Sequence, residues 1–379
     1  MARGSDTKPI VQSVTLPSGS LKAALKTVVA AVEARSTIPI LSNVLIRVTA
    51  EHLTVTATDL DIEITRQVPV GAASGSWGTT VLGRVLSSAV DKLPKETEVT
   101  LTVEDGRLRM QCGRARFTLP TLPVDDFPFI AHGDWAAQWE MEGAVLAEAL
   151  AHARPAMCTE ETRYYLNGVL VERREGCLWI VATDGHRLHA VSLAAPDGSE
   201  PLADMTASLI VPRKAVPIIQ TLCAEGRIDL AFSQGKMMLV AGETTLVSKL
   251  IDGTFPDWRR VVPESADKSC DFDPRALEDA LGRVAAIHTG KERAVKVDIG
   301  GDCIELSVSC PETGTAIEEI EAANQGEAVI GFNGRFLADV LAQLPGEHAT
   351  VAFTNGDGPT KWSKAIGSDR FCVLMPMRV

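Results

Sequence analysis

The segment DPRALEDALGRVAAIH, residues 273–288, carries a clear helical signal. Asp273 followed by Pro274 marks a helix start, because an aspartate side chain accepts hydrogen bonds from free backbone N–H groups and proline suits the first turn. Apolar residues then recur at helical spacing, and polar residues occupy the opposite face. The segment therefore predicts an amphipathic helix that packs one face against a core.

The same pattern occurs twice more in the chain. Residues 20–32 read SLKAALKTVVAAV, and residues 145–157 read VLAEALAHARPAM. Each helix is followed by alternating, β-branched runs with short turns, then by a second helical pattern and another pair of strand-like runs. The second helical patterns occupy residues 82–94, 211–222 and 332–345. Asn333 is placed to cap the last of them.

These copies make a threefold repeat with a period near a third of the 379 residues. The order strand, helix, strands, helix, strands predicts α+β domains with a largely antiparallel sheet. The triplet ATD recurs at residues 57–59 and 182–184, but the third copy lacks it. A duplicated binding scaffold is one explanation. Three full copies with little linker favour a fixed geometric task instead.

The composition limits the class of protein. Apolar residues make up 45% of the chain, enough for two or three packed domains. The 8 cysteines are scattered without a C-x-x-C pair, which suits a reducing cytosol better than a disulfide framework or a zinc site. We find no secretory signal and no apolar run long enough to span a bilayer. We therefore expect a cytoplasmic protein with no cofactor and no metal site.

The formal net charge of −12 argues against a protein that grips DNA by bulk attraction. Positive charge is concentrated in six helical windows, which are residues 20–33, 82–93, 145–157, 212–223, 274–288 and 334–344. They hold ten basic and six acidic residues, which leaves 27 of the 37 basic and 43 of the 49 acidic residues elsewhere. A surface lined by these helices would tolerate phosphates. Ordinary solvated helix faces would give the same excess, so both interpretations stay open.

Five motifs carry a family likeness. They are RSTIPILSN from Arg35, RYYLNG from Arg163, ATDGHRL from Ala182, FPDWRRV from Phe255 and MPMRV from Met375. In this order, on top of the threefold repeat, they resemble the beta subunit of bacterial DNA polymerase III, the sliding-clamp family. The likeness runs in register from about Ile10 to Val379.

The resemblance implies an α+β fold of three similar DNA-clamp domains per chain, at residues 10–133, 134–262 and 263–379. Two chains would join head to tail into a six-domain ring with helices lining the hole. The implied function is that of a DNA polymerase processivity factor, which is not an enzyme. The ring would slide on double-stranded DNA without sequence specificity, so its affinity for DNA can be weak and a negative net charge is no contradiction.

The resemblance also implies protein partners, namely the replicative polymerase catalytic subunit, the clamp loader, other polymerases and repair proteins. Their short linear motifs would bind a cleft between the second and third domains. The matching residues are Leu166, Thr183, Gly185, His186, Arg187, Leu188, Pro256, Arg260, Val261, Val373, Leu374, Met375, Pro376, Met377 and Arg378. Methionine adapts to varied side chains, and the arginines could hold acidic groups of a peptide. Pro376 cannot donate to a strand ladder, so this segment should lie at a sheet edge or leave the sheet. The alternative to a cleft is that VLMPM is only a last core strand.

Contacts to DNA are implied at Arg35, Arg163, Tyr164, Tyr165 and Lys214. The helix charge count adds Arg84, Lys92 and Arg213. Arginine and lysine contact phosphates without reading sequence, as a sliding ring requires. The two tyrosines could equally pack within the domain. Glu160 and Glu161 add negative charge to a loop that is neutral in the family, which argues against a phosphate contact there.

The ring interface is implied at Arg114, Arg116, Phe117 and Leu119 on the first domain and at Ile287 on the third. Glu312, Glu318 and Glu319 could pair with the arginines. Fewer acidic residues stand here than is usual in the family, so we expect a ring with fewer ion pairs, each contributing about 0–1 kcal/mol. Ordinary protection of an edge strand would produce a similar alternation of polar and apolar residues.

Two other function classes compete with this one. An enzyme could use Asp184 and His186, but no nucleophile elbow accompanies them, and Gly290-Lys291 lacks the upstream glycine of a phosphate-binding loop. A turn histidine that is structural or faces a peptide is the simpler interpretation. A generic peptide-binding scaffold would bind the same peptides without being retained on DNA.

Overall fold

The computed structural model describes residues 12–33, 37–94, 96–131, 133–205, 208–263, 266–289 and 293–378. They fall into two compact units, one made of the residues up to 143 together with 221–249, and one made of 144–220 together with the residues from 250 onward. Each unit is built on one continuous sheet, and every strand pair found among the described residues is antiparallel, as predicted. No helix in the described ranges is long and apolar enough to cross a membrane.

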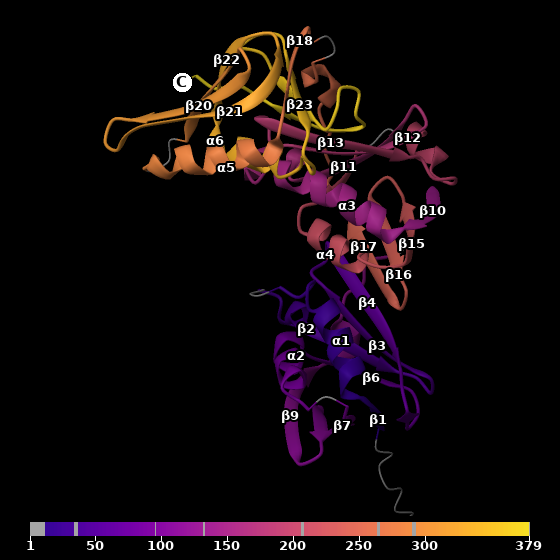
Figure 1. Ribbon diagram of the computed structural model, residues 1–379. Helices are drawn as coiled ribbons and strands as arrows, with labels where there is room; N and C mark the ends of the chain where they lie inside the picture. The colour runs from indigo at the N-terminus through magenta and orange to yellow at the C-terminus, as the bar shows by residue number, and fades with distance from the viewer. Residues whose placement is uncertain are drawn as a thin grey trace, which may run out of the picture. The chain divides into compact units, whose positions relative to one another are not determined.

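The first unit contains a 13-stranded sheet (Figure 1). In sheet order its strands are β10 (Ala137–Glu142), β15 (Arg227–Phe232), β16 (Lys236–Ala241), β17 (Thr244–Lys249), β4 (Ile62–Pro69), β3 (His52–Thr58), β2 (Asn43–Val48), β6 (Trp77–Leu82), β9 (Ala115–Leu122), β8 (Arg107–Cys112), β7 (Glu98–Glu104), β1 (Gln12–Pro17) and β5 (Ala72–Ala73). Its helices are α1 (Ser18–Val28) and α2 (Gly83–Asp91), with 3-10 turns at Pro39–Ser42 and Val124–Asp126. The two helices contact each other, and α1 packs on β3 and β4.

The second unit contains a 12-stranded sheet. In sheet order its strands are β14 (Leu209–Pro212), β11 (Gly168–Arg174), β12 (Cys177–Thr183), β13 (Arg187–Ala194), β25 (Arg370–Leu374), β24 (Thr360–Ser363), β23 (Ala349–Phe353), β18 (Lys268–Phe272), β21 (Gly314–Gln325), β20 (Cys303–Cys310), β19 (Ala294–Gly300) and β22 (Ala328–Asn333). Its helices are α3 (Gly143–Ala153) from its second residue on, α4 (Ala215–Leu222) except for its last two residues, α5 (Pro274–Val284) and α6 (Gly334–Leu341). Its 3-10 turns are Arg154–Ala156, Glu161–Leu166, Glu200–Asp204, Trp258–Val261 and Ala285–Ile287.

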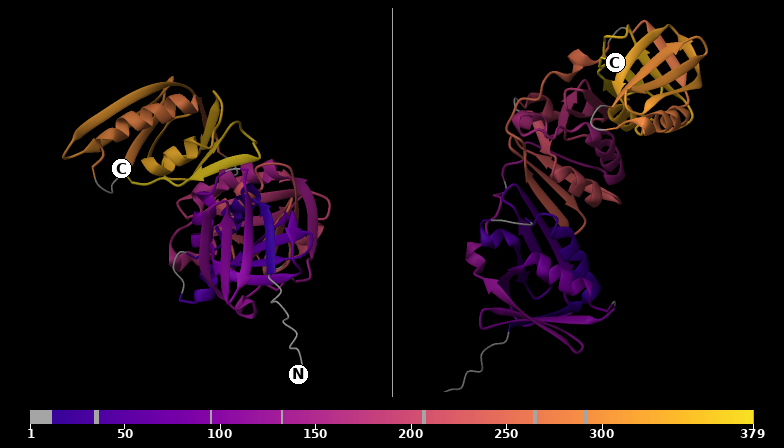
Figure 2. Two further views of the ribbon diagram at one scale, coloured as in Figure 1. Left: turned by 90° about the horizontal axis from the view of Figure 1, so that it is seen from below. Right: turned by 90° about the vertical axis from the view of Figure 1, so that its left-hand side faces the viewer.

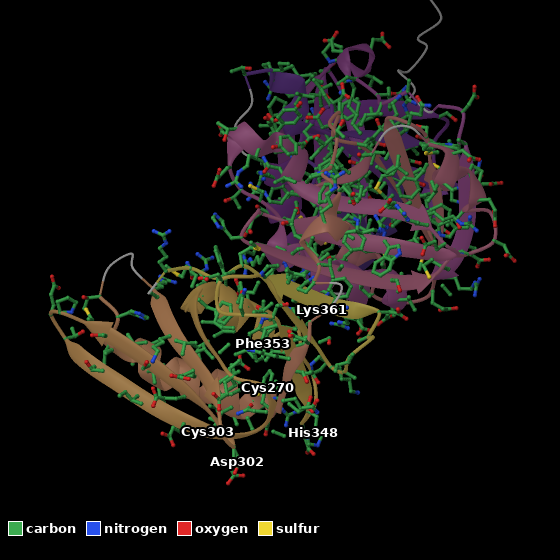
Figure 3. The ribbon with its side chains drawn as sticks, turned by 90° about the horizontal axis from the view of Figure 1, so that it is seen from above. Cys270, Asp302, Cys303, His348, Phe353 and Lys361 are labelled. Atoms are coloured by element: carbon green, nitrogen blue, oxygen red, sulfur yellow. The ribbon has the colours of Figure 1, made fainter. Side chains whose placement is uncertain are left out.

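The helices α5 and α6 lie side by side against the strands β20, β21 and β22 (Figure 2). The core beneath them is apolar and contains Cys270 and Phe353, which Figure 3 labels in the interior, whereas Asp302 points outward from the β19–β20 turn. Gly334 opens α6 close to this core, and a Cβ atom there would lie 2.9 Å from a methyl group of Val295. A larger residue would therefore force α6 away from the sheet.

The predicted helices are all present, and their predicted caps are confirmed. Asp273 Oδ1 accepts a hydrogen bond from the backbone N–H of Arg275 at 2.8 Å, and Asn333 Oδ1 accepts one from that of Arg335 at 3.0 Å. The α-helical part of the third-repeat helix ends at Val284, earlier than predicted, and continues as a 3-10 turn. Apolar spacing alone does not separate a last α turn from a 3-10 turn.

Candidate functional site

The predicted partner cleft has its floor in the second unit, where β13 pairs with β25. In this antiparallel pair Leu188 stands opposite Val373 and Arg187 opposite Leu374. Leu188, Val373 and Leu166 are buried in one apolar cluster that also includes Phe255 and Trp258, the neighbours of the predicted Pro256. Segments far apart in the sequence are thus brought together, while their role as a partner cleft stays a prediction.

The ATDGHRL motif forms the turn that precedes β13, and local hydrogen bonds explain its residue types. Thr183 Oγ1 donates to the backbone oxygen of Arg187 at 2.7 Å and accepts from the N–H of Gly185 at 3.1 Å. Asp184 Oδ1 accepts from the N–H of Arg187 at 3.0 Å. Gly185 has φ +86°, and a Cβ atom there would also lie 2.7 Å from the guanidinium of Arg163. Only glycine meets both conditions without strain.

Arg187 is held by its own chain. Its side chain is only 7% exposed and forms ion pairs with Asp184 at 3.2 Å and with Asp339 of α6. It also donates to the backbone oxygen of Pro155 at 2.5 Å, and its guanidinium carbon lies 4.5 Å from the ring centroid of Phe336. The residue therefore braces the turn against α6. Each of its three nitrogens already donates to a partner within the chain, and its predicted role of holding a peptide group stays a prediction.

The rim of the cleft is exposed. Met375, Met377 and Val261 are large apolar side chains that face solvent, and Arg260 is exposed and paired with Asp257 at 3.2 Å. Pro256 and Arg378 are exposed as well. Flexible apolar side chains beside a cationic rim suit peptides that carry apolar and acidic residues.

The end of the chain leaves the sheet after Leu374, as Pro376 predicted. The N–H of Met375 donates to the backbone oxygen of His186 at 2.9 Å, and the N–H of Met377 donates to that of Gly331 at 2.8 Å. These backbone bonds hold the terminal segment against the turn before β13 and against β22, while its methionine side chains stay exposed.

Two of the predicted DNA-facing residues line a cavity of about 1070 Å³ in the second unit. Arg213 and Lys214 line it, and so do Arg154 and Arg335, two further basic residues of the helical windows. Residues Arg154, His186, Arg187, Arg213, Lys214, Arg335, Glu160 and Asp184 give the lining a cationic excess. Such a surface can receive phosphates.

The other predicted DNA-facing residues have different surroundings. Arg163 forms an ion pair with Glu160 at 2.6 Å, which lowers the pKa of that carboxyl, so part of its charge is neutralised, in line with the expectation for this loop. Tyr164 is 53% exposed, whereas Tyr165 packs against the cleft's apolar cluster. Arg84 and Lys92 are exposed on or beside α2. Arg35 lies outside the described residues.

In the first unit, β9 carries the predicted interface residues Arg116, Phe117 and Leu119, with Arg114 just before it. The strand pairs with β8 along residues 115–120 but with β6 only through residues 121–122. Among the described residues, the other edge of residues 115–120 therefore has no strand partner. Phe117 and Leu119 are half-buried there.

In the second unit, β21 has a similar edge. It pairs with β20 along residues 314–321 and with β18 only along 322–325, so within the described ranges one edge of 314–321 lacks a strand partner. Ile317 on this stretch is 61% exposed, and sequence reasoning missed it. Of the other residues predicted for this side of the interface, Glu312 and Glu319 are exposed and Ile287 is half-buried. Glu318 is bound by Arg283 at 2.5 Å, which lowers the pKa of its carboxyl.

Comparison with known proteins decides the family. Family models of the DNA polymerase III beta subunit match the chain in three consecutive parts, with the N-terminal domain at residues 14–131, the central domain at 140–257 and the C-terminal domain at 259–378. The chain belongs to this family. The prediction of three clamp domains is confirmed, while the limits that we predicted for them stay a prediction.

Curated relatives in the family cover nearly the whole chain. A beta sliding clamp from Caulobacter vibrioides is 38% identical over 379 residues, covering 97% of this chain and 100% of the relative. One from Pseudomonas putida is 33% identical over 368 residues, covering 96% and 99%. Membership makes the chain a DNA polymerase processivity factor of the sliding-clamp type, as the resemblance predicted.

Solved structures of the family match the fold. A sliding clamp from Bartonella birtlesii, bound to griselimycin, has a TM-score of 0.92 and 33% identity, covering 97% of this chain and 100% of that one. A DNA polymerase sliding clamp from Caulobacter crescentus has a TM-score of 0.90 and 37% identity with the same coverage. The individual cleft, DNA-facing and interface residues remain predictions.

The contacts of Arg187 give a test of the site's construction. We expect Arg187→Met to lower the free energy of unfolding by about 3 kcal/mol, because removal of one member of a buried ion pair leaves Asp184 and Asp339 without their cation. Chemical denaturation measures the change. Arg260→Met is the matched control, since that side chain is 83% exposed and should change stability by less than about 0.5 kcal/mol. Equal effects of the two substitutions would contradict this account.

Proposed function

We propose that two copies of this chain join head to tail into a ring that encircles duplex DNA and tethers a polymerase to it. The observation that carries this proposal is the pair of strand edges, residues 115–120 of β9 and 314–321 of β21, that lack strand partners in the described chain. Such an edge is a template for pairing with another chain. Because the two edges differ, their pairing is heterologous, and two copies can close it into a ring.

The side chains along these edges support the pairing. Phe117 and Leu119 on β9 and Ile317 on β21 offer apolar contacts that would remove exposed surface from water. The charges are complementary, with Arg114 and Arg116 on one edge and exposed glutamates on the other. We assign the intermolecular pairing to Glu312 and Glu319 and leave out Glu318, since Arg283 of its own chain already binds it.

We propose that the basic helices line the hole of the ring. Arg84, Lys92, Arg213 and Lys214, with Arg163 and Tyr164, would contact phosphates as the ring slides, and none of these contacts reads base sequence. The ring is retained because it is linked around the duplex. Strong attraction is therefore not required, and a net charge of −12 is compatible with DNA as a partner.

We also propose that short linear motifs of the replicative polymerase, the clamp loader, other polymerases and repair proteins bind the cleft of β13, β25 and the terminal segment. Met375, Met377 and Val261 would receive their apolar residues, and Arg260 and Arg378 their acidic ones. Tethering by a closed ring needs no chemical step. We therefore give His186 no catalytic role, because its ring stacks on Phe336 with centroids 5.8 Å apart.

Charge placed on the cleft rim should block partner binding. We expect the double substitution Met375→Asp, Met377→Asp to weaken binding of a clamp-type peptide at least about 30-fold, because loss of a central apolar anchor costs about 2 kcal/mol or more. Fluorescence anisotropy with a labelled peptide measures this, and dimer mass should stay unchanged. Ile366→Asp is the control, as Ile366 is also a solvent-exposed apolar residue but lies outside the predicted cleft. Unchanged affinity in the double variant would remove the cleft assignment.

Charge placed on the β9 edge should open the ring. We expect Phe117→Asp or Leu119→Asp to give monomers, because a carboxylate would be desolvated in the proposed interface. Sedimentation or light scattering gives the mass. Phe129→Asp is the matched control, since Phe129 is an exposed aromatic residue outside the interface set and its substitution should preserve the dimer. A dimer that persists in both β9 variants would refute this edge.

Retention on DNA tests the function as a whole. The protein is threaded onto linear duplex at low salt, both ends are blocked, and the DNA is washed at high salt beside DNA with free ends. Phosphate contacts weaken steeply with salt, whereas a topological link does not. We expect retention only with blocked ends, and none for Phe117→Asp. Equal loss of the threaded protein from both DNAs would contradict the ring and favour a peptide-binding scaffold.

A further inference from the structure

Two histidines and a cysteine meet in the interior of the second unit. His152 lies on α3, His189 on β13 and Cys372 on β25, where His189 and Cys372 are opposite each other in the strand pair. All three side chains are fully buried. One donor atom from each, a ring nitrogen or Sγ, lies within 4.8 Å of the other two. They form the one such group of metal-ligand side chains found in the described part of the chain.

The hydrogen bonds of the two rings define their free lone pairs. His189 Nδ1 donates to the backbone oxygen of His152 at 2.8 Å, so its Nε2 carries a lone pair. That Nε2 is buried and has no hydrogen-bond partner among the described residues. His152 Nε2 faces the backbone oxygens of Ala190 and Phe371, both at 3.2 Å, while its Nδ1 accepts from Arg370 Nε at 3.2 Å. A buried lone pair without a donor costs about 1–3 kcal/mol, so this one requires an explanation.

The three side chains are in forms suited to metal binding or reach them by losing one proton. Burial lowers the pKa of His152 to about 4 and that of His189 to about 3, so both rings are neutral near pH 7. Burial raises the pKa of the Cys372 thiol, which therefore keeps its proton while the site is empty. A cation that binds here must displace that proton to solvent, because the thiolate is the ligand form.

We propose that His152, His189 and Cys372 form a buried binding site for a single Cu⁺ ion. Two imidazole nitrogens and one thiolate in a trigonal arrangement are a donor set that proteins use for copper. The copper–sulfur bond replaces the S–H bond, and the released proton goes to solvent. No electron is transferred, so the step needs no oxidant or reductant.

Charge selects Cu⁺ over Zn²⁺ in this site. One thiolate balances one monovalent cation, which leaves the buried cluster neutral. Zn²⁺ would leave an uncompensated positive charge away from water and close to Arg370, which already donates to His152. Zinc also prefers four ligands, with water as the fourth when the protein supplies three. These fully buried side chains offer three.

The present separations allow the site to form with small movements. Bonds of about 2.0 Å to nitrogen and about 2.3 Å to sulfur at trigonal angles place the donors about 3.5–3.7 Å apart. From the observed limit of 4.8 Å, the donor atoms would have to approach one another by at most about 1.3 Å. On His152, Nδ1 would exchange its bond from Arg370 for the metal. Arg370 would keep its ion pair with Glu148 at 2.5 Å.

A bound ion would tie three elements together next to the partner cleft. His189 and Cys372 immediately follow and precede the cleft-floor residues Leu188 and Val373 in the same strand pair. The ion would join these strands to α3, across a sheet seam that otherwise depends on backbone bonds and packing. The three side chains are far apart in the sequence, so no sequence motif indicates the cluster. The proposed site differs in this respect from the prediction, made from the sequence, that the chain has no metal site.

Copper binding by the full-length chain tests the proposal. Reduced protein is titrated anaerobically with Cu⁺ against a coloured Cu⁺ chelator, and X-ray absorption gives the ligands of the bound ion. We expect one Cu⁺ per chain with two nitrogen and one sulfur ligand. Cys372→Ser should weaken this site by more than about 100-fold, since even changes to groups that only support a ligand cost 10–100-fold. Cys270→Ser is the matched control, because Cys270 is equally buried in the same unit (Figure 3).

Several outcomes would overturn the site. In the first, the chelator keeps all of the copper in the presence of the unsubstituted chain. In the second, Cys372→Ser binds Cu⁺ as tightly as the unsubstituted chain does. In the third, X-ray absorption shows sulfur ligands only, which indicates binding by the other cysteines. Tighter binding of Zn²⁺ than Cu⁺ through the same ligands would refute the choice of ion. If Cys372→Ser fails to fold by circular dichroism, His189→Ala takes its place. The ligand count of the unsubstituted chain decides the matter without any variant.

Discussion

Backbone pairing between β13 and β25 is the interaction on which the second unit depends. It joins strands that are more than 170 residues apart into one sheet, and it sets Leu188 opposite Val373 and His189 opposite Cys372. The predicted partner cleft and the candidate metal cluster both depend on this register. A slip by one residue would turn every side chain of one strand to the other face, so neither site would survive it.

Several charged side chains of this protein form ion pairs within their own chain. Arg187 is neutralised by Asp184 and Asp339, Arg163 by Glu160, and Arg283 by Glu318. Each pair lowers the charge that its residues can offer to DNA, a partner peptide or a second chain. Arg154, Arg213, Lys214 and Arg335 line the large cavity of the second unit, which is the candidate phosphate surface. A ring that is linked around DNA needs weak, sliding contacts more than tight ones, so a modest number of phosphate contacts is sufficient.

Residues 115–120 of β9 and 314–321 of β21 each have one strand edge without a strand partner in the described chain. Long unpaired edges promote uncontrolled association in most proteins and are usually blocked by charge or covered. Here the exposed Ile317 and the half-buried Phe117 lie on such edges. A closed ring would pair both edges at once and leave none open. The proposed ring would therefore cover edges that would promote aggregation of a monomer.

The sequence by itself determined the threefold repeat, the helices, the antiparallel sheets and the family. These rest on short-range physics, namely helical spacing, the caps at Asp273 and Asn333 and the turn chemistry of ATDGHRL, which act within a few neighbouring residues. Only the tertiary structure decided that Arg187 is a brace held by Asp339, that Ile317 lies on an open edge, and that His152, His189 and Cys372 meet. Those contacts join residues far apart in the chain, and local patterns of a single sequence contain no information about which distant partner a side chain will meet.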